Sequence, residues 1–234
     1  MKLALIGNGV MGQLVATRAR HAGHEIGTVL GSPAAVCGIE ELANQLRGHD
    51  AAIDFSVSGA VLKNVKACAH AGVPLVEGTT AWQAQESQVR QIILEHHGAL
   101  VYGANFSVGV NIFYRLVAHA AALFASVPDY APFIEEAHHA RKRDAPSGTA
   151  LSLVALLKEH SERDIPIAST RAGYIPGTHR VGFDSPPDQI TLTHTARSRE
   201  GFAAGALLAA SWIVGRNGVY EFSEVIDDFV ASNK

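Results

Sequence analysis

The length and composition of this 234-residue chain already limit the kind of protein it encodes. Hydrophobic residues make up 47% and charged residues 18%, with a mean hydropathy of +0.12, which excludes a largely disordered chain. Lysine and arginine total 19 against 22 aspartates and glutamates, so the formal net charge is −3. This weakly acidic balance argues against sequence-independent binding of nucleic acid, which needs a basic surface.

The cysteine and hydropathy patterns predict a cytoplasmic protein without a membrane partner. Cys37 and Cys68 lie far apart and outside any metal-binding motif, so we expect two thiols in a reducing compartment. The most apolar stretch, residues 201–215, is too short to span a membrane. The apolar run at residues 3–6 is likewise too short for a signal peptide.

The first half of the chain alternates predicted strands and helices, which is typical of a parallel sheet. Apolar runs predict strands at residues 3–6, 25–30, 51–55, 73–76 and 99–102. Helical patterns lie between them at residues 11–22, 59–71 and 82–97. The sequence therefore predicts an α/β fold, a Rossmann-type doubly wound parallel sheet, over residues 1–106.

The pattern changes from residue 107 onward, which indicates a second, smaller α+β domain with a mixed sheet at residues 107–206. Strands are expected at residues 130–140, 165–171, 174–183 and 189–196. Helices are expected at residues 108–125, from Ser147 onward, and at residues 201–214 and 219–230. We expect the C-terminal segment, residues 207–234, to return to the first domain.

A G-x-G-x-x-G motif lies directly after the first strand and opens a helix. Its residues are Gly7, Asn8, Gly9, Val10, Met11 and Gly12. Gly7 permits a tight turn, Gly9 permits close approach of a pyrophosphate, and Gly12 permits close packing of helix and strand. The free N–H groups of the helix start would bind the phosphates. The context favours a dinucleotide site over an ordinary glycine-rich turn, and the missing Gly-Lys-Ser/Thr excludes a P-loop.

The residues after the second predicted strand do not indicate whether the cofactor is NADH or NADPH. Leu30 is followed by Gly31, Ser32 and Pro33, without an acid for the ribose hydroxyls or an arginine for a 2′-phosphate. Ser32 could bond a ribose hydroxyl or a phosphate. The sequence therefore predicts NADH or NADPH as the cofactor and leaves the preference open.

Two loops after the fourth and fifth strands are further candidates for the cofactor site. Ligands of such sheets bind at the carboxyl ends of the strands. The residues in these positions are Gly78, Thr79 and Thr80, and Gly103, Ala104, Asn105 and Phe106. From spacing alone, simple turn chemistry explains them nearly as well.

The segment at residues 135–150 carries the chemistry expected of the second domain. Ser147-Gly148-Thr149 begins a helix whose N–H groups would bind a carboxylate, and Lys142 adds positive charge beside it. His138 can donate a proton near neutral pH. Because adjacent strand residues point to opposite faces, His138 and His139 cannot easily share one metal, and we expect none.

This segment resembles the signature of the 4-hydroxy-tetrahydrodipicolinate reductase family, also called dihydrodipicolinate reductase. The matching string is His138-His139-x-x-Lys142-x-Asp144-Ala145-Pro146-Ser147-Gly148-Thr149-Ala150. Supporting matches are the glycine motif and residues 54–56, 78–80, 105–111 and 194–206. Ala81 departs from the family pattern, in which glycine is common at that position.

The resemblance implies an NAD(P)H-dependent enzyme of lysine and diaminopimelate biosynthesis that reduces a cyclic, unsaturated imine dicarboxylate. His138 matches the proton donor and Lys142 the catalytic lysine. His139, Ser147, Gly148 and Thr149 match substrate-binding positions, and the three glycine-containing loops match cofactor-binding positions. The resemblance also implies a homotetramer built through the sheet of the second domain.

Two alternatives to this interpretation stay open at this point. A nicotinamide oxidoreductase of the sugar dehydrogenase type would share the two-domain plan but carries Glu-Lys-Pro where this chain has Glu77-Gly78-Thr79. A non-enzymatic dinucleotide-binding regulator would not need His138 and Lys142 in one pocket.

Overall fold

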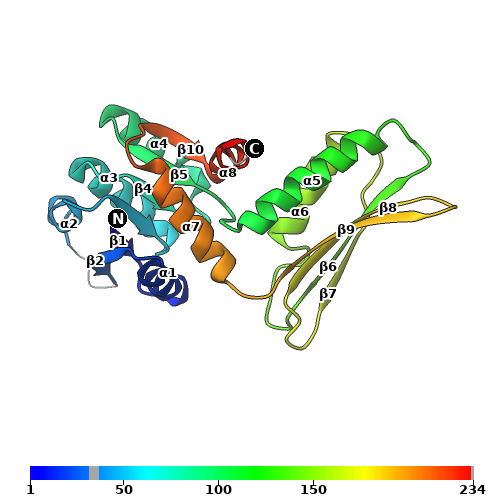
Figure 1. The fold of residues 1–234 in the computed structure, drawn as a ribbon, viewed down its shortest axis with the longest axis horizontal. Coiled ribbons are helices and arrows are strands. Elements are labelled where there is room, and N and C mark those ends of the chain that lie inside the picture. The colour runs from blue at the N-terminus through cyan, green and yellow to red at the C-terminus, as the bar shows by residue number, and fades with distance from the viewer. Residues whose placement is uncertain (32–36, 233–234) are drawn as a thin grey trace. The chain divides into compact units, whose positions relative to one another are not determined.

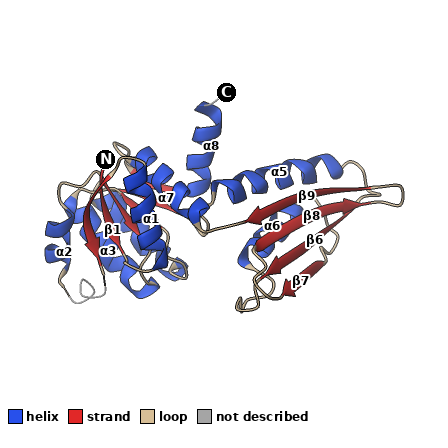
Figure 2. Cartoon of the chain, turned by 60° about the horizontal axis from the view of Figure 1, so that its bottom comes forward, coloured by secondary structure: helices blue, strands red, loops and turns tan. Residues whose placement is uncertain are grey.

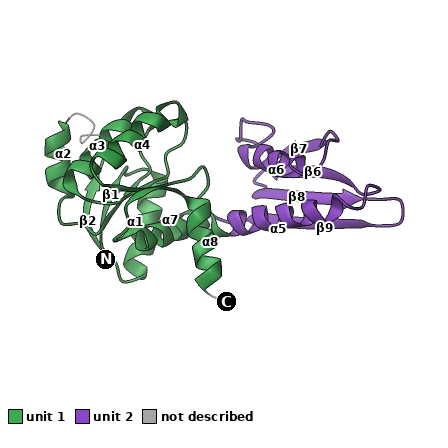
Figure 3. Cartoon of the chain, turned by 90° about the horizontal axis from the view of Figure 1, so that it is seen from above, with its two compact units in different colours: residues 1–108, 199–234 green, residues 109–198 purple. Residues whose placement is uncertain are grey.

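The structure is a computed structural model that describes residues 1–31 and 37–232. Ser32, the candidate ribose or phosphate contact, lies outside the described residues. The chain divides into two compact units, unit 1 with residues 1–108 and 199–234 and unit 2 with residues 109–198 (Figure 3). The chain thus re-enters unit 1 at residue 199, eight residues before the return that the sequence predicts at residue 207.

The described residues of unit 1 form a six-stranded parallel sheet with the strand order β10-β5-β4-β3-β1-β2 (Figure 1). The strands are β1 (Lys2–Ile6), β2 (Glu25–Leu30), β3 (Ala51–Asp54), β4 (Leu75–Glu77), β5 (Ala99–Tyr102) and β10 (Gly218–Glu221). The helices are α1 (Val10–His21), α2 (Ile39–Leu46), α3 (Val61–Ala71), α4 (Glu86–Glu95), α7 (Glu200–Ile213) and α8 (Phe222–Ser232). Helices α2, α3 and α4 pack in a row, whereas α7 packs on β3, β4 and β5 and beside α1. The predicted Rossmann-type sheet is confirmed.

The central strands of this sheet are apolar because helices cover both of their faces. Every residue of β3 and β4 is buried, as are residues 3–6 of β1. Such continuous burial removes the alternation of polar and apolar residues that marks a half-exposed strand. The sheet therefore supplies a rigid base whose carboxyl edge carries the glycine motif and the loops after β3, β4 and β5.

Two elements of unit 1 differ from the sequence-based expectation. Helix α2 (Ile39–Leu46) was not expected, although Leu42, Ala43 and Leu46 form its buried face. The segment expected as a helix from residue 219 begins instead as strand β10, which pairs in parallel with β5, and α8 starts only at Phe222. That pairing joins residues more than a hundred positions apart, so no local pattern indicates it.

Unit 2 is a four-stranded mixed sheet with two helices on one side (Figure 2). Its elements are α5 (Val108–Phe124), β6 (Ala131–His138), α6 (Gly148–Lys158), β7 (Ile167–Arg171), β8 (Gly177–Asp184) and β9 (Gln189–Ala196). The strand order is β7-β6-β8-β9; β6 pairs in parallel with β7 and antiparallel with β8, and β8 pairs antiparallel with β9. The predicted α+β domain with a mixed sheet is confirmed.

The core of unit 2 lies between its sheet and its two helices. Phe113 and Val117 of α5, Leu153 of α6, and Ile134 and Val181 of the sheet are all buried in one apolar cluster. Strand β6 alternates strictly between buried and less buried residues, which shows that only one of its faces meets this core. In the described part of the chain, no helix combines the length and apolarity needed to cross a membrane.

Two buried carboxyl groups, Asp54 and Glu77, end the neighbouring strands β3 and β4 and hold the loops that follow. Asp54 accepts hydrogen bonds from the Ser56 backbone N–H at 2.7 Å and from Asn64 Nδ2 at 2.6 Å. Glu77 Oε1 accepts the backbone N–H of Thr79 at 2.7 Å. Its other oxygen, Oε2, is buried without a hydrogen-bond partner among the described residues. Burial, followed by the charge of Asp54, raises the pKa of Glu77 well above its usual value.

We expect Glu77→Gln to make the stability of the protein less dependent on pH. Because the folded state holds the Glu77 proton more tightly than the unfolded chain, wild-type stability falls as the pH rises above the unfolded pKa of about 4. Glutamine keeps the acceptor for Thr79 and removes that titration. Urea unfolding from about pH 5 to about pH 8 measures the difference.

The control for this experiment is Glu41→Gln, which changes an exposed carboxyl group of α2 in the same unit. Its stability should follow the wild-type pH dependence. Parallel curves for wild type and Glu77→Gln would contradict the assignment of a buried, protonated carboxyl group.

Candidate active site

The glycine motif forms the turn between β1 and α1. Gly7 has φ +98, a left-handed conformation that favours glycine, and a Cβ there would lie 2.5 Å from the carbonyl oxygen of Phe55. A Cβ on Gly12 would lie 1.9 Å from the carbonyl oxygen of Gly7, so α1 packs directly on the loop. Gly9 is the N-cap residue of α1, and a Cβ there would meet no atom within 4 Å. The helix start is therefore open to an anion.

A cavity of about 790 Å³ adjoins this turn. Its lining combines the glycine turn, the end of β2, Leu42 of α2 and the segment after β3: Ile6, Gly7, Asn8, Gly9, Leu30, Gly31, Leu42, Phe55, Ser56, Val57, Gly59, Ala60, Lys63 and Asn64. Among the described residues that line the cavity, Lys63 alone has an ionisable side chain. The volume, the open helix start and a single cation suit the phosphate-containing part of a dinucleotide.

The predicted cofactor residues fall into two groups in the structure. Gly7, Asn8 and Gly9 line the cavity, whereas Val10, Met11 and Gly12 form the first turn of α1 next to it. The sequence analysis did not single out Lys63 or Ser56 as site residues. Both residues are far from the glycine motif along the chain, so the sequence does not link them to it. Both nevertheless follow β3 at the carboxyl edge of the sheet.

The other two predicted cofactor loops, residues 78–80 and 103–106, do not line this cavity but contact Phe55, which does. A Cβ on Gly78 would lie 2.2 Å from the Phe55 ring, and the Phe106 ring lies 6.2 Å from it between centroids. Phe106 is itself buried against Phe222, so its side chain serves the core. Ala81, where glycine is common in the family, has φ +64, a conformation that explains that preference.

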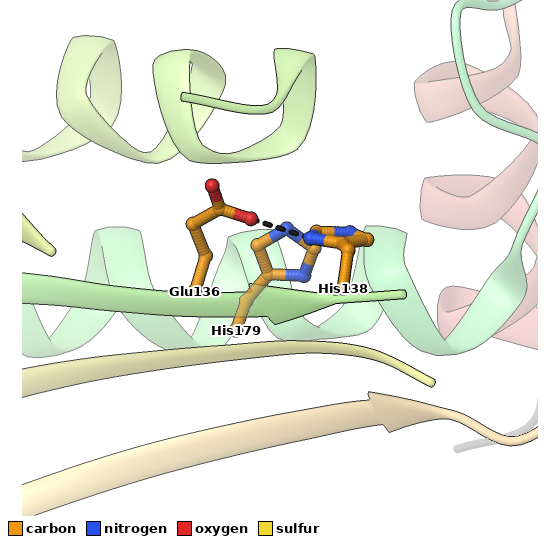
Figure 4. A group of neighbouring side chains, drawn as sticks. All are labelled: Glu136, His138 and His179. Carbon is orange, nitrogen blue, oxygen red and sulfur yellow. Dashed lines mark ion pairs between the residues drawn. The ribbon is translucent and has the colours of Figure 1, made fainter. Parts of the chain in front are cut away.

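In unit 2, the end of β6 places Glu136 and His138 on the buried face of the sheet (Figure 4). Nδ1 of His138 lies 2.5 Å from Oε2 of Glu136, and Nη2 of Arg171 donates to Oε1 of Glu136 at 2.6 Å. Burial acts to raise the pKa of Glu136, but the hydrogen bond from Arg171 and the nearby charges outweigh it and lower that pKa. Glu136 is therefore a buried carboxylate that links a cation to the predicted proton donor.

His179 of β8 connects His138 to the start of α6. The two imidazole rings meet edge to face with 5.1 Å between centroids. Nε2 of His179 shares a hydrogen bond of 2.9 Å with Oγ of Ser147, which also accepts the backbone N–H of Ala150 and so caps α6. Burial, followed by repulsion from His138, lowers the pKa of His179 to about 4. His179 is thus neutral at physiological pH, and the Ser147 side chain is engaged in capping.

The predicted catalytic lysine, Lys142, and the predicted substrate residues His139 and Gly148 lie in the segment that follows His138. Lys142 donates to both carboxylate oxygens of Asp144 at 2.8 Å, which lowers the pKa of Asp144. Gly148 is exposed at the start of α6, and a Cβ there would meet no atom within 4 Å, so its backbone is accessible to a ligand. His139 is partly buried, and its Nδ1 has no hydrogen-bond partner within the described residues.

The three side chains Glu136, His138 and His179 also offer ligand atoms within 4.8 Å of one another, the donor set of a catalytic zinc site. In their present arrangement, these three side chains would have to move apart before a metal ion could bind between them. The 2.5 Å contact between Glu136 and His138 leaves no space for a cation between them, and Arg171 already neutralises the carboxylate. The arrangement is that of an ion-paired acid–base cluster.

Glu136, Arg171 and His179 were missed by the sequence analysis. Glu136 could have been found, because residues two apart on a strand share a face and it lies two positions before His138. Arg171 and His179 become visible only through the pairing of β6 with β7 and β8, in which Arg171 is opposite His138 and His179 is opposite Glu136.

Comparison with known proteins agrees with both halves of this description. Residues 1–106 match the model for "Dihydrodipicolinate reductase, N-terminus" and residues 109–226 that for "Dihydrodipicolinate reductase, C-terminus". The 4-hydroxy-tetrahydrodipicolinate reductase of Christiangramia forsetii is 35% identical, over 97% of this chain and 98% of its own. That of Methanoregula boonei is 37% identical, over 76% of this chain and 74% of its own.

A solved structure shares the fold as well. The dipicolinate-bound dihydrodipicolinate reductase from Paenisporosarcina sp. TG-14 aligns with a TM-score of 0.77 at 20% identity, over 94% of this chain and 97% of its own. The two family models together span nearly the whole chain and both of its units. The chain therefore belongs to the dihydrodipicolinate reductase family.

Proposed function

We propose that this protein is an NAD(P)H-dependent 4-hydroxy-tetrahydrodipicolinate reductase of lysine and diaminopimelate biosynthesis. The family membership of both units carries this proposal, and it is supported by the cluster of His138, Lys142 and the start of α6 within one segment of unit 2. The substrate is then a cyclic, unsaturated imine dicarboxylate. A sugar dehydrogenase or a non-catalytic regulator is not favoured by these observations.

In this proposal, unit 1 holds the cofactor through the glycine turn and the helix start behind it. Gly7, Gly9 and the N-terminus of α1 bind the pyrophosphate, and Lys63 adds a positive charge to the same cavity. Residues 78–80 and 103–106, at the ends of β4 and β5, contact the nicotinamide side. A reduced nicotinamide, when bound, supplies the hydride.

Unit 2 binds the substrate and supplies the proton. The N–H groups of Gly148 and Thr149 at the start of α6 bind a substrate carboxylate, and His139 contacts the substrate. Lys142 exchanges its partner Asp144 for the negative charge of the substrate, and His138 protonates the atom that becomes electron-rich as the ring is reduced.

We further propose a cytoplasmic homotetramer that assembles through the sheet of unit 2. Cys37 and Cys68 lie far apart in the sequence and outside any metal-binding motif, as suits a reducing compartment. Ile190 of β9 is exposed, and the side chains of β7 are largely exposed, so this sheet offers a surface to another subunit.

The activity is tested by cofactor oxidation with the freshly prepared condensation product of aspartate semialdehyde and pyruvate, with NADH and NADPH in parallel. We expect both cofactors to be used, with specificity constants within about a hundredfold, or roughly 2.7 kcal/mol. The reason is that neither an acid nor an arginine follows Leu30. If neither NADH nor NADPH is oxidised, the proposed function is contradicted. If the two specificity constants differ by much more than a hundredfold, a determinant of cofactor specificity lies outside the segment after Leu30.

Gly9→Val should weaken dinucleotide binding without unfolding the protein. The added side chain would enter open space at the cavity, where the pyrophosphate is proposed to lie. We expect Kd to rise at least about tenfold, whereas the local cost of replacing this N-cap residue is about 1 kcal/mol. Fluorescence titration with each dinucleotide and thermal unfolding measure the two effects.

Gly38→Val is the matched control for Gly9→Val. Gly38 is likewise an N-cap residue, of α2, with open space around its Cβ position, but it does not line the cavity. It should lose a similar amount of stability and keep its dinucleotide affinity. Equal dinucleotide affinities in the two variants would show that the pyrophosphate does not bind at the turn after β1.

Lys142→Ala and His138→Ala should slow catalysis while leaving dinucleotide affinity nearly unchanged. Loss of the lysine charge costs on the order of 2–4 kcal/mol of transition-state stabilisation, about thirtyfold to a thousandfold in rate. Loss of His138 leaves water as the proton source. Steady-state kinetics and dinucleotide titration of each purified variant provide the readouts.

The control in the same loop is Arg143→Ala, which removes an exposed charge next to Lys142 and should retain most of the activity. Near-wild-type turnover in both Lys142→Ala and His138→Ala would exclude the proposed catalytic roles. Loss of dinucleotide binding in either one would show that the segment serves the cofactor instead.

A further inference from the structure

Glu136 is the most deeply buried charged group of unit 2, and nothing in the proposed reaction yet accounts for it. Its side chain is fully buried, on the face of β6 that meets the core. Burial of a carboxylate is costly unless ion pairs and hydrogen bonds compensate it. Each of its oxygens faces one such partner: His138 on Oε2 and Arg171 on Oε1.

The position of Arg171 keeps Glu136 ionised. Arg171 ends β7 opposite His138 in the parallel pairing, so its guanidinium reaches Glu136 across the two strands. Nη2 of Arg171 also donates to the carbonyl oxygen of Asp144 at 2.6 Å. The same side chain therefore ties the buried carboxylate to the loop that carries Lys142.

The contact with Glu136 selects one tautomer of His138. Nδ1 of His138 lies 2.5 Å from the Glu136 carboxylate, and a lone pair on Nδ1 would face that negative charge, so the tautomer with a hydrogen on Nδ1 is favoured. The other nitrogen, Nε2, is then the atom that gains and loses the proton. Nε2 lies beside Gly177, where a Cβ would come within 3.1 Å of it, so the absence of a side chain at Gly177 leaves this nitrogen space.

We propose that Glu136, held by Arg171, is the positioning residue of the proton donor: it fixes the ring of His138 and directs Nε2 to the substrate. The inference rests on the proposed catalytic role of His138. In the proton-transfer step the imidazolium gives its Nε2 proton to the substrate atom and becomes the neutral tautomer with a hydrogen on Nδ1. Glu136 stays ionised throughout and takes no proton.

The pKa of His138 depends on its burial and on the charged groups around it. Burial, with the charges of Lys142 and Arg171, lowers the pKa of His138, and the Glu136 carboxylate opposes that shift. The neighbouring His179 of β8 is neutral at physiological pH. Removal of the Glu136 charge should therefore lower the pKa of His138 further, so that His138 loses its proton at a lower pH.

Glu136→Gln tests the proposal, with Glu135→Gln as its matched control. Both residues belong to β6, but Glu135 lies on the opposite, more exposed face and pairs with Arg180. We expect Glu136→Gln to lower kcat about 10- to 100-fold, part of what a general acid contributes, with little change in KM. Its alkaline limb of kcat/KM against pH should move to lower pH. Glu136→Asp, which keeps the charge, should recover part of the kcat, and Glu135→Gln should match wild type.

A second measurement does not depend on the folding of Glu136→Gln or on activity. Nitrogen NMR of the wild-type protein labelled in histidine, with His138 assigned by its absence in His138→Ala, should show the hydrogen of neutral His138 on Nδ1. A hydrogen on Nε2, or wild-type kcat and pH profile in Glu136→Gln while His138→Ala is impaired, would overturn the positioning role alone. Full activity of His138→Ala would instead refute the proposed function and this inference together.

Zinc binding by the same cluster is the alternative that a further measurement tests. If His138, Glu136 and His179 bound zinc in the working enzyme, the purified protein would contain the metal stoichiometrically, and a chelator would shift the His138 resonances. We expect neither effect, and observing both would overturn the positioning role.

Discussion

Burial of charge at the carboxyl ends of strands is the constraint on which both units of this protein depend. A carboxyl group away from water must either find donors or keep its proton. In unit 1, Asp54 finds donors in Ser56 and Asn64, whereas Glu77 has one oxygen without a hydrogen-bond partner among the described residues, and burial raises the pKa of both groups. These bonds hold the backbone of the loops after β3 and β4, where ligands of parallel sheets bind.

Unit 2 meets the same constraint with an ion pair beside the proposed proton donor. Arg171 neutralises Glu136, and Glu136 in turn orients the imidazole of His138. His179 extends the cluster to the cap of α6, so the proposed proton donor and the proposed carboxylate-binding helix start share one framework of polar and ring contacts. A rigid arrangement of this kind lets an acid and an anion site act on one small substrate without reorganising during the reaction.

The two kinds of site differ in what their backbone requires. The turn after β1 depends on close approach, since a side chain at Gly7 or Gly12 would collide with carbonyl groups. Gly9, in contrast, adjoins open space, which is where a ligand gains access to the helix start. The glycines of one motif thus separate into those that build the turn, Gly7 and Gly12, and one that leaves the helix start open, Gly9.

The sequence by itself determined the features that depend on neighbouring residues: the apolar strands of unit 1, the glycine turn before α1, and the segment from His138 to Thr149. It also identified the family, because that segment is long and specific. Only the tertiary structure placed β10 in the sheet, joined Lys63 to the glycine turn, and brought Arg171 and His179 to Glu136. These contacts arise from strand pairing and packing between distant parts of the chain, whereas propensity and periodicity report only on residues within a few positions of one another.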